Sequence, residues 1–86
     1  MLTKTFTIQF PEGLHARPAS ELTKVCQKFK SEVVLEKSER TVNPKSIIGI
    51  LSLGATKGDA ITVTTEGEDE QEAMLAIEAF MHKTEI

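Results

Sequence analysis

The chain has 86 residues, of which 40% are hydrophobic and 27% are charged, with a formal net charge of −3. This size allows one small core, so we expect a single domain over residues 1–86, and the acidic balance argues against nucleic acid as a direct ligand. One cysteine excludes an internal disulfide, and no apolar stretch is long enough to span a membrane, so we expect a cytoplasmic protein without membrane insertion.

The N-terminal segment predicts a strand followed by a helix. Residues 2–10 alternate between apolar and polar side chains, with Lys4 as the exception, and this alternation indicates a half-buried strand. Residues 16–29 change to a helical period, with an apolar stripe at spacings of three and four residues. The stripe consists of Ala19, Leu22, Cys26 and Phe29. Pro18 lies in the first turn of this helix, where its missing N–H group does no harm.

The middle of the chain predicts a hairpin and a short helix. Two short strands are expected over residues 32–37 and 40–42, with a turn at residues 38–39 that reverses the chain. Ser46 stands where a helix N-cap residue is expected, and residues 47–53 have the pattern of a short helix.

The C-terminal part predicts a fourth strand and a last helix. Residues 60–65 alternate again, and the acidic residues at 68–70 suit the first turn of a helix because they complement its dipole. The buried stripe of that helix consists of Ala73, Met74, Ile77, Phe80 and Met81. The order βαββαβα, with one apolar face on each strand, predicts an α+β fold with helices on one side of an antiparallel sheet.

The main functional signal is a histidine at the start of the first helix, in the segment Gly13-Leu14-His15-Ala16-Arg17-Pro18-Ala19-Ser20. A helix start exposes N–H groups and the positive end of the helix dipole, so it favours bound anions. A neutral imidazole is nucleophilic near neutral pH and can accept a phosphoryl group on a ring nitrogen. The phosphoryl oxygens would receive N–H bonds from Ala16 and Arg17, and the Arg17 guanidinium would add a charge-assisted contact. We interpret His15 as the phosphoryl acceptor of a carrier, not as the base of an enzyme.

Other interpretations have less support. A histidine near a helix terminus often serves only the helix, and His82, near the end of the last helix, is assigned no role for that reason. A metal site needs three or four ligands, whereas Cys26 lies on an apolar stripe and the two histidines lie in unrelated elements. The glycines form no phosphate-binding loop pattern. We therefore expect no metal and no cofactor.

A second segment, at residues 43–54, has the sequence Asn43-Pro44-Lys45-Ser46-Ile47-Ile48-Gly49-Ile50-Leu51-Ser52-Leu53-Gly54. Together with residues 13–19 it resembles the HPr family, the histidine-containing phosphocarriers of the bacterial phosphoenolpyruvate:sugar phosphotransferase system. The resemblance covers essentially the whole chain and implies an open-faced β-sandwich with a four-stranded antiparallel sheet. It also implies that His15 accepts a phosphoryl group from enzyme I and passes it to enzyme IIA domains of sugar permeases. Arg17 would stabilise the phosphohistidine.

The resemblance further implies regulation through Ser46. This residue would match the serine that an ATP-dependent HPr kinase/phosphorylase modifies in low-GC Gram-positive bacteria, and a phosphate on an N-cap serine meets a helix start. One side of the short helix would form an exposed docking patch for enzyme I, for enzyme IIA and, in the Ser46-phosphorylated form, for a catabolite-control repressor. The patch consists of Ile47, Ile48 and Leu51, while Ile50 and Leu53 turn to the core. We expect a monomer.

Two alternatives within this family stay open. An HPr-like regulatory protein would act mainly through phospho-Ser46 in carbon catabolite repression, although regulators of that kind have lost the active histidine, which this chain has as His15. The second alternative is a phosphocarrier of the nitrogen-related branch of the phosphotransferase system. Residues 45–47 and 52–54, however, resemble the carriers of the sugar branch more closely. Glu12 departs from the small polar residue expected near His15, and its carboxylate would repel a phosphate. Glu12 therefore leaves the transfer rate and the partner preference open.

Overall fold

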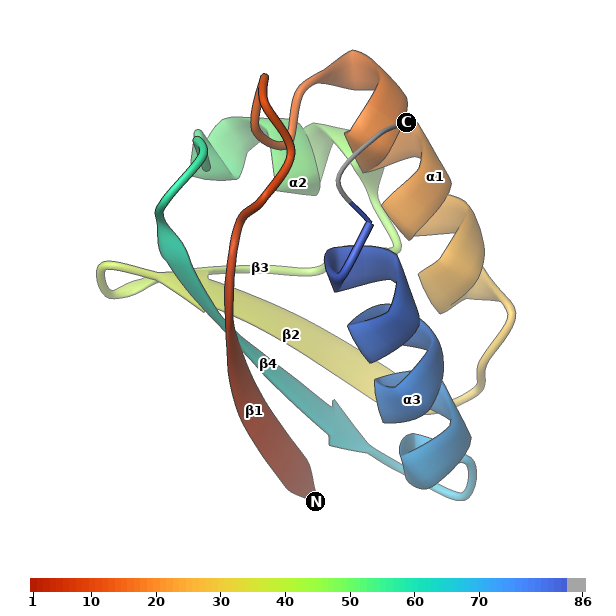
Figure 1. Ribbon diagram of the computed structural model, residues 1–86. Helices are drawn as coiled ribbons and strands as arrows, with labels where there is room; N and C mark the ends of the chain where they lie inside the picture. Colours follow the sequence, from red (N-terminus) through yellow and green to blue (C-terminus); the bar gives the residue numbers. More distant parts are fainter. Residues whose placement is uncertain (84–86) are drawn as a thin grey trace.

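The structure, a computed structural model, describes residues 1–83. Within them the elements follow the predicted order: β1 (Leu2–Thr7), α1 (Ala16–Gln27), β2 (Glu32–Lys37), β3 (Arg40–Val42), α2 (Ile47–Leu53), β4 (Ala60–Glu66) and α3 (Glu70–Met81). The four strands form one antiparallel sheet in the order β1-β4-β2-β3. Figure 1 shows the helices of this part of the chain on one side of the sheet, which confirms the predicted open-faced α+β fold.

The sheet has one polar face and one apolar face because successive side chains of a strand point to opposite sides. β1 and β4 pair in a register that places Thr3 opposite Thr64 and Thr5 opposite Thr62. The two hydroxyls of each pair lie within hydrogen-bond distance, at 3.3 Å and 3.1 Å. The opposite face carries the buried side chains Phe6, Val33, Leu35, Ile61 and Val63. The apolar face is therefore the one that the helices cover.

Lys4 interrupts the apolar alternation of β1, and the place of β1 at the edge of the sheet explains how it is accommodated. Its Nζ lies 3.5 Å from Oε2 of Glu78 on α3, and about half of the side chain is exposed. The ammonium group is thus placed at the sheet edge, where it pairs with Glu78 instead of entering the core.

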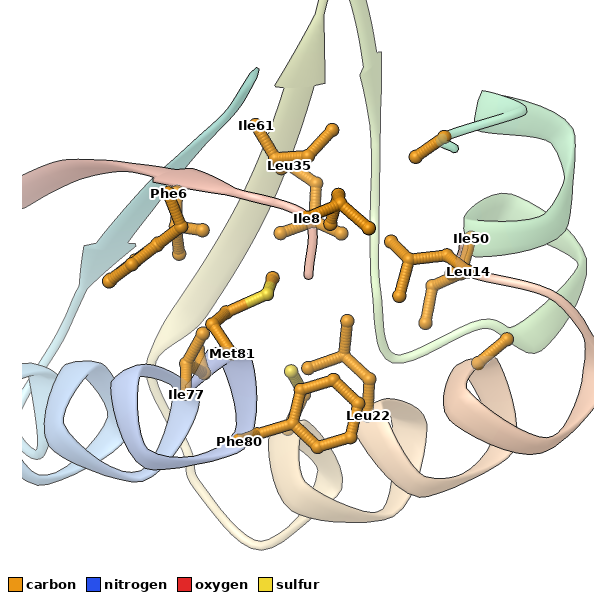
Figure 2. Close-up of a cluster of buried hydrophobic side chains, with 14 of the residues drawn as sticks. Phe6, Ile8, Leu14, Leu22, Leu35, Ile50, Ile61, Ile77, Phe80 and Met81 are labelled. Atoms are coloured by element: carbon orange, nitrogen blue, oxygen red, sulfur yellow. The ribbon is translucent and has the colours of Figure 1, made fainter. Parts of the chain in front are cut away.

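The core fills the space between the sheet and the helices. Figure 2 shows Leu35 and Ile61 of the sheet on one side of this space, with Leu22 of α1 and Phe80 of α3 on the other. The Phe80 ring packs against Phe10 with 5.1 Å between the ring centroids. Burial of each large apolar side chain of this kind contributes about 1.5–3 kcal/mol, so this layer holds the helices on the sheet.

The first strand and the first helix are shorter than predicted. β1 ends at Thr7 instead of residue 10, because its partner β4 begins only at Ala60 and the residues before it form a turn. α1 ends at Gln27 instead of Phe29. The N–H group of Phe29 donates to the carbonyl of Cys26, three residues earlier, and this tighter turn closes the helix. Phe29 is consequently only half-buried.

The start of α3 also differs from the prediction. The helix begins at Glu70, and Asp69 is its N-cap residue instead of a member of the first turn. The Asp69 carboxylate accepts the N–H groups of Lys30 and Ser31, each at 2.9 Å, and the hydroxyl of Ser31. These bonds, led by that of the Ser31 hydroxyl, lower the pKa of Asp69 from 3.8 to about 2. Asp69 therefore joins the loop after α1 to the start of α3.

Candidate functional site

His15 occupies the N-cap position of α1, where the chain changes from extended to helical backbone. Its carbonyl accepts the first helical hydrogen bond, from the N–H of Ala19 at 2.8 Å. Its side chain is exposed and, among residues 1–83, makes no capping bond to the helix. Pro18 has no N–H group, so the backbone donors that this helix start presents are those of Ala16 and Arg17, both exposed residues. The imidazole thus lies beside these donors and is not used to cap the helix.

Contacts with the segment after α2 fix the position of the His15 loop. The N–H of Leu14, a buried residue, donates to the carbonyl of Ala55 at 3.0 Å. Gly13 has a φ of +73°, and a Cβ atom there would meet the Ala55 oxygen and lie 2.8 Å from Cα of Thr56. The loop therefore requires a glycine at this position, both for its backbone conformation and for this close approach.

An open hollow of about 480 Å³ lies beside His15. Its lining consists of Pro11, Glu12, His15, Thr56 and Lys57. Glu12, expected near His15, does line this hollow. Thr56 and Lys57 are residues that the sequence analysis missed, because no local pattern connects them to the histidine segment.

The turn that carries Thr56 and Lys57 is held by its own hydrogen bonds. The N–H of Thr56 donates to Oδ2 of Asp59 at 2.8 Å, and Nζ of Lys37 lies 3.2 Å from the same oxygen. The backbone bond from Thr56 and then the bond from Lys37 lower the pKa of Asp59 below its ordinary value. Lys37 also donates to the Gly54 carbonyl at 3.1 Å, so its ammonium group links the Asp59 carboxylate to the end of α2.

Ser46 is the N-cap residue of α2, as predicted. Its Oγ accepts the N–H of Gly49 at 3.3 Å, and the residue is exposed. The preceding Lys45 is fixed from both sides, because its Nζ donates to the Phe29 carbonyl at 2.8 Å and its own carbonyl accepts from Gln27 at 3.0 Å. The Ser46 hydroxyl is therefore presented to solvent from a well-held helix start.

The outer side of α2 is apolar and exposed. Ile47, Ile48 and Leu51 are 38%, 75% and 44% exposed. Ile50 and Leu53 point to the core and are buried, so the predicted division of this helix into two sides is confirmed. That the three exposed residues bind partners stays a prediction.

The other titratable candidates lie elsewhere. Cys26 is fully buried in α1, and burial raises the pKa of its thiol to about 12, which makes it a neutral core residue. His82 is the C-cap residue of α3, and its ring packs edge-on against Phe6 with 6.3 Å between centroids. Within residues 1–83 no three His, Cys, Asp or Glu side chains gather as a metal site would need. No helix of that part of the chain is both long and apolar enough to cross a membrane.

The fold and the site together define a class of small α+β proteins with an exposed histidine at a helix start beside a short helix with an apolar outer side. The family model described as the PTS HPr component phosphorylation site matches residues 2–83. The chain therefore belongs to the HPr family of phosphocarrier proteins.

Both carriers and regulators occur among its relatives. The chain is 45% identical over 83 residues to the HPr-like protein Crh of Halalkalibacterium halodurans, a match that covers 96% of this chain and 99% of that one. The crystal structure of the phosphocarrier protein HPr from Bacillus anthracis superposes with a TM-score of 0.90 at 40% identity, over 94% of this chain and 96% of that one. Crh of Bacillus subtilis, solved as a dimer with a swapped domain, has a TM-score of 0.78 at 36% identity, over 100% and 99% of the two chains.

Proposed function

We propose that this protein carries phosphoryl groups between proteins, accepting them on His15 from phosphorylated enzyme I and passing them to enzyme IIA domains of sugar permeases. The observation that carries the proposal is the exposed His15 imidazole at the start of α1, beside the backbone donors of the first turn. In the transfer, the bond between phosphorus and the donor breaks as a bond to a ring nitrogen of His15 forms. The reverse exchange on enzyme IIA restores the imidazole, so the protein is a carrier and not itself an enzyme.

The groups around His15 suit this role. The N–H groups of Ala16 and Arg17 point toward the N-terminal end of α1, where a phosphoryl group on His15 would lie. The guanidinium of Arg17, in the same helical turn, supplies a cation for the new negative charge. Neither role requires a cofactor or a metal ion.

A second part of the proposal concerns α2. Ile47, Ile48 and Leu51 form the docking patch for enzyme I and enzyme IIA, because they are apolar, exposed and on one side of a rigid helix. Ser46, at the edge of this patch, is the target of an HPr kinase/phosphorylase. A phosphate there would place about two negative charges beside the patch, which weakens docking of acidic partners and favours a catabolite-control repressor with a basic surface. The carrier would work in the cytoplasm as a monomer.

Two phosphorylation reactions on separate samples test the proposal. Phosphoenolpyruvate with enzyme I is expected to give an acid-labile label that is lost in His15→Ala and that moves to a sugar-specific enzyme IIA. ATP with HPr kinase is expected to give an acid-stable label that is lost in Ser46→Ala. Each variant serves as the control for the other reaction, because the two residues are the N-cap residues of different helices.

The relationship to Crh supports a second candidate, an HPr-like regulator that acts through phospho-Ser46 in carbon catabolite repression. It predicts the acid-stable label at Ser46 and no acid-labile label. A nitrogen-branch carrier predicts an acid-labile label on His15 that no sugar-specific enzyme IIA accepts. The presence of His15 favours the carrier over the regulator.

A further inference from the structure

Lys57 and Glu12 bring opposite charges to the hollow beside His15. Two segments line the hollow together with His15, one with Pro11 and Glu12 just before the histidine and the other with Thr56 and Lys57 after α2. Both charged residues are exposed. Among residues 1–83 they form no ion pair with each other or with other side chains, so the space between them is open to a ligand.

The backbone holds Lys57 at this place. Its turn closes with a bond from the Asp59 N–H to the Thr56 carbonyl at 3.0 Å. The N–H of Gly58 donates to the Ile8 carbonyl at 2.9 Å, and the Ile8 N–H donates to the Asp59 carbonyl at 2.9 Å. These bonds fasten the turn to the segment that leads to His15. The Lys57 side chain therefore starts from a fixed point beside the imidazole and keeps a flexible stem with which to reach a ligand.

Lys37, which reaches the same turn, is already engaged, because it pairs with Asp59 and donates to the Gly54 carbonyl. A phosphoryl group carries about −1.5 to −2 charges near neutral pH. On His15 it would enter a hollow whose lining already includes Glu12, and that like charge is unfavourable. A cation in the same lining would offset the repulsion.

We propose that Lys57, which lines the hollow together with Glu12, is a ligand of the phosphoryl group on His15. This inference rests on the proposed phosphorylation of His15. Lys57 stabilises the more negative form of the phosphoryl group and Glu12 destabilises it, so the pair sets the charge state in which the group is presented to a partner. Arg17 acts from the helix side in addition.

The test measures the ionisation of the phosphoryl group itself. The protein is phosphorylated chemically with phosphoramidate, whose P–N bond breaks with release of ammonia as the bond to the imidazole forms. A His82→Gln background leaves His15 as the single histidine to be labelled. The ³¹P chemical shift is then followed against pH. Arg17 is present in every variant, so its contribution is common to all of them.

Lys57→Gln is expected to raise the midpoint of this ionisation by about 0.3–0.7 pH units, the range for an exposed charge pair. Glu12→Gln is expected to lower it. Lys28→Gln is the matched control, because Lys28 is equally a surface lysine but lies past the opposite end of α1, and it should leave the midpoint unchanged. Equal midpoints for Lys57→Gln and Lys28→Gln would overturn the inference.

Phosphoramidate also separates this inference from the proposed function, because it bypasses enzyme I. If enzyme I fails to label the unmodified protein while the chemical product shows the Lys57 shift, the carrier function is wrong and the phosphoryl site stands. If enzyme I labels His15 and the midpoint does not respond to Lys57, the carrier function stands and Lys57 has no part in it.

Discussion

Gly13 and Ala55 approach each other so closely that no side chain fits between the Gly13 Cα and the Ala55 carbonyl oxygen. This contact joins the loop that carries His15 to the segment that follows α2, two parts of the chain far apart in sequence. The neighbouring bond from the Leu14 N–H to the same carbonyl holds them in register. The place of His15 beside Lys57 therefore depends on a glycine at position 13.

Gly13→Ala is expected to destabilise the protein and to slow phosphorylation of His15. The alanine would need a left-handed backbone, which costs about 1–2 kcal/mol, and its methyl group would collide with Ala55 in addition. Gly54→Ala is the control, because Gly54 also has a positive φ of +65° but a Cβ there meets no atom of residues 1–83 within 4 Å. Urea unfolding should show a larger loss for Gly13→Ala. Equal losses would mean that the contact with Ala55 does not hold the loop.

Ile48 and Ile50 lie two residues apart on α2, but truncation to alanine is expected to affect transfer at Ile48 and stability at Ile50. Ile50→Ala removes a fully buried side chain and should cost about 2–5 kcal/mol of unfolding free energy. Ile48→Ala should change stability by less than about 0.5 kcal/mol but reduce kcat/KM for phosphorylation by enzyme I about tenfold, because it would remove an apolar side chain from the proposed docking patch. Unchanged kinetics in Ile48→Ala would argue against that patch.

Ser46→Ala is expected to lower the unfolding free energy by about 0.5–1 kcal/mol, since it removes the cap bond to the Gly49 N–H. Ser46→Asp should keep most of the stability, because an aspartate caps a helix and favours its positive end. It should at the same time weaken phosphorylation by enzyme I through its charge. Thermal unfolding of the three proteins measures the first effect and initial transfer rates the second. A Ser46→Asp variant that matches the unmodified protein in transfer would contradict the regulatory proposal.

Asp69 is expected to account for part of the loss of folding stability at acid pH. Its pKa is lowered from 3.8 in the unfolded chain to about 2 in the folded one, so the folded state favours the charged form. The resulting stabilisation is complete above about pH 4 and is lost as the pH falls toward 2. Asp59 and Glu70, whose pKa values are also lowered, act in the same direction.

Asp69→Asn should therefore lower the urea midpoint at pH 7 and flatten its dependence on pH between 4 and 2. The asparagine amide cannot accept all of the bonds from Lys30 and Ser31. Glu68→Gln, at the preceding and exposed position, is the control and should leave the curve unchanged. If Asp69→Asn keeps the acid dependence of the unmodified protein, the bonds to residues 30 and 31 do not link the loop to α3.

The local sequence pattern was sufficient to predict the order of the helices and strands, and also the first residue and the buried side of α2. The N-cap role of Ser46 and the inward side of the helix follow from the spacing of a few neighbouring residues. The turn at Ser38 and Glu39 was also predicted, although it contains no glycine. Both residues adopt positive φ values, of 49° and 70°, because the paired strands on either side require a tight reversal.

What depends on distant contacts could not be predicted in the same way. The N-cap role of Asp69 at the start of α3 accompanies its bonds to the loop at residues 30–31, across a separation of more than 35 residues. The wall of the hollow at Thr56 and Lys57 is placed beside His15 through the approach of Gly13 to Ala55. Sequence spacing shows a turn at residues 56–59 but not what that turn faces.

The most direct test of the carrier function is the location and amount of phosphoryl group after incubation with phosphoenolpyruvate and enzyme I. We predict one acid-labile phosphoryl group per chain, found by mass spectrometry on the peptide that contains His15 and absent from His15→Ala. His82→Ala, which alters the other histidine, is expected to be labelled like the unmodified protein. Label on His82, label on Ser46 alone, or no label with active enzyme I would contradict the proposed carrier function of His15.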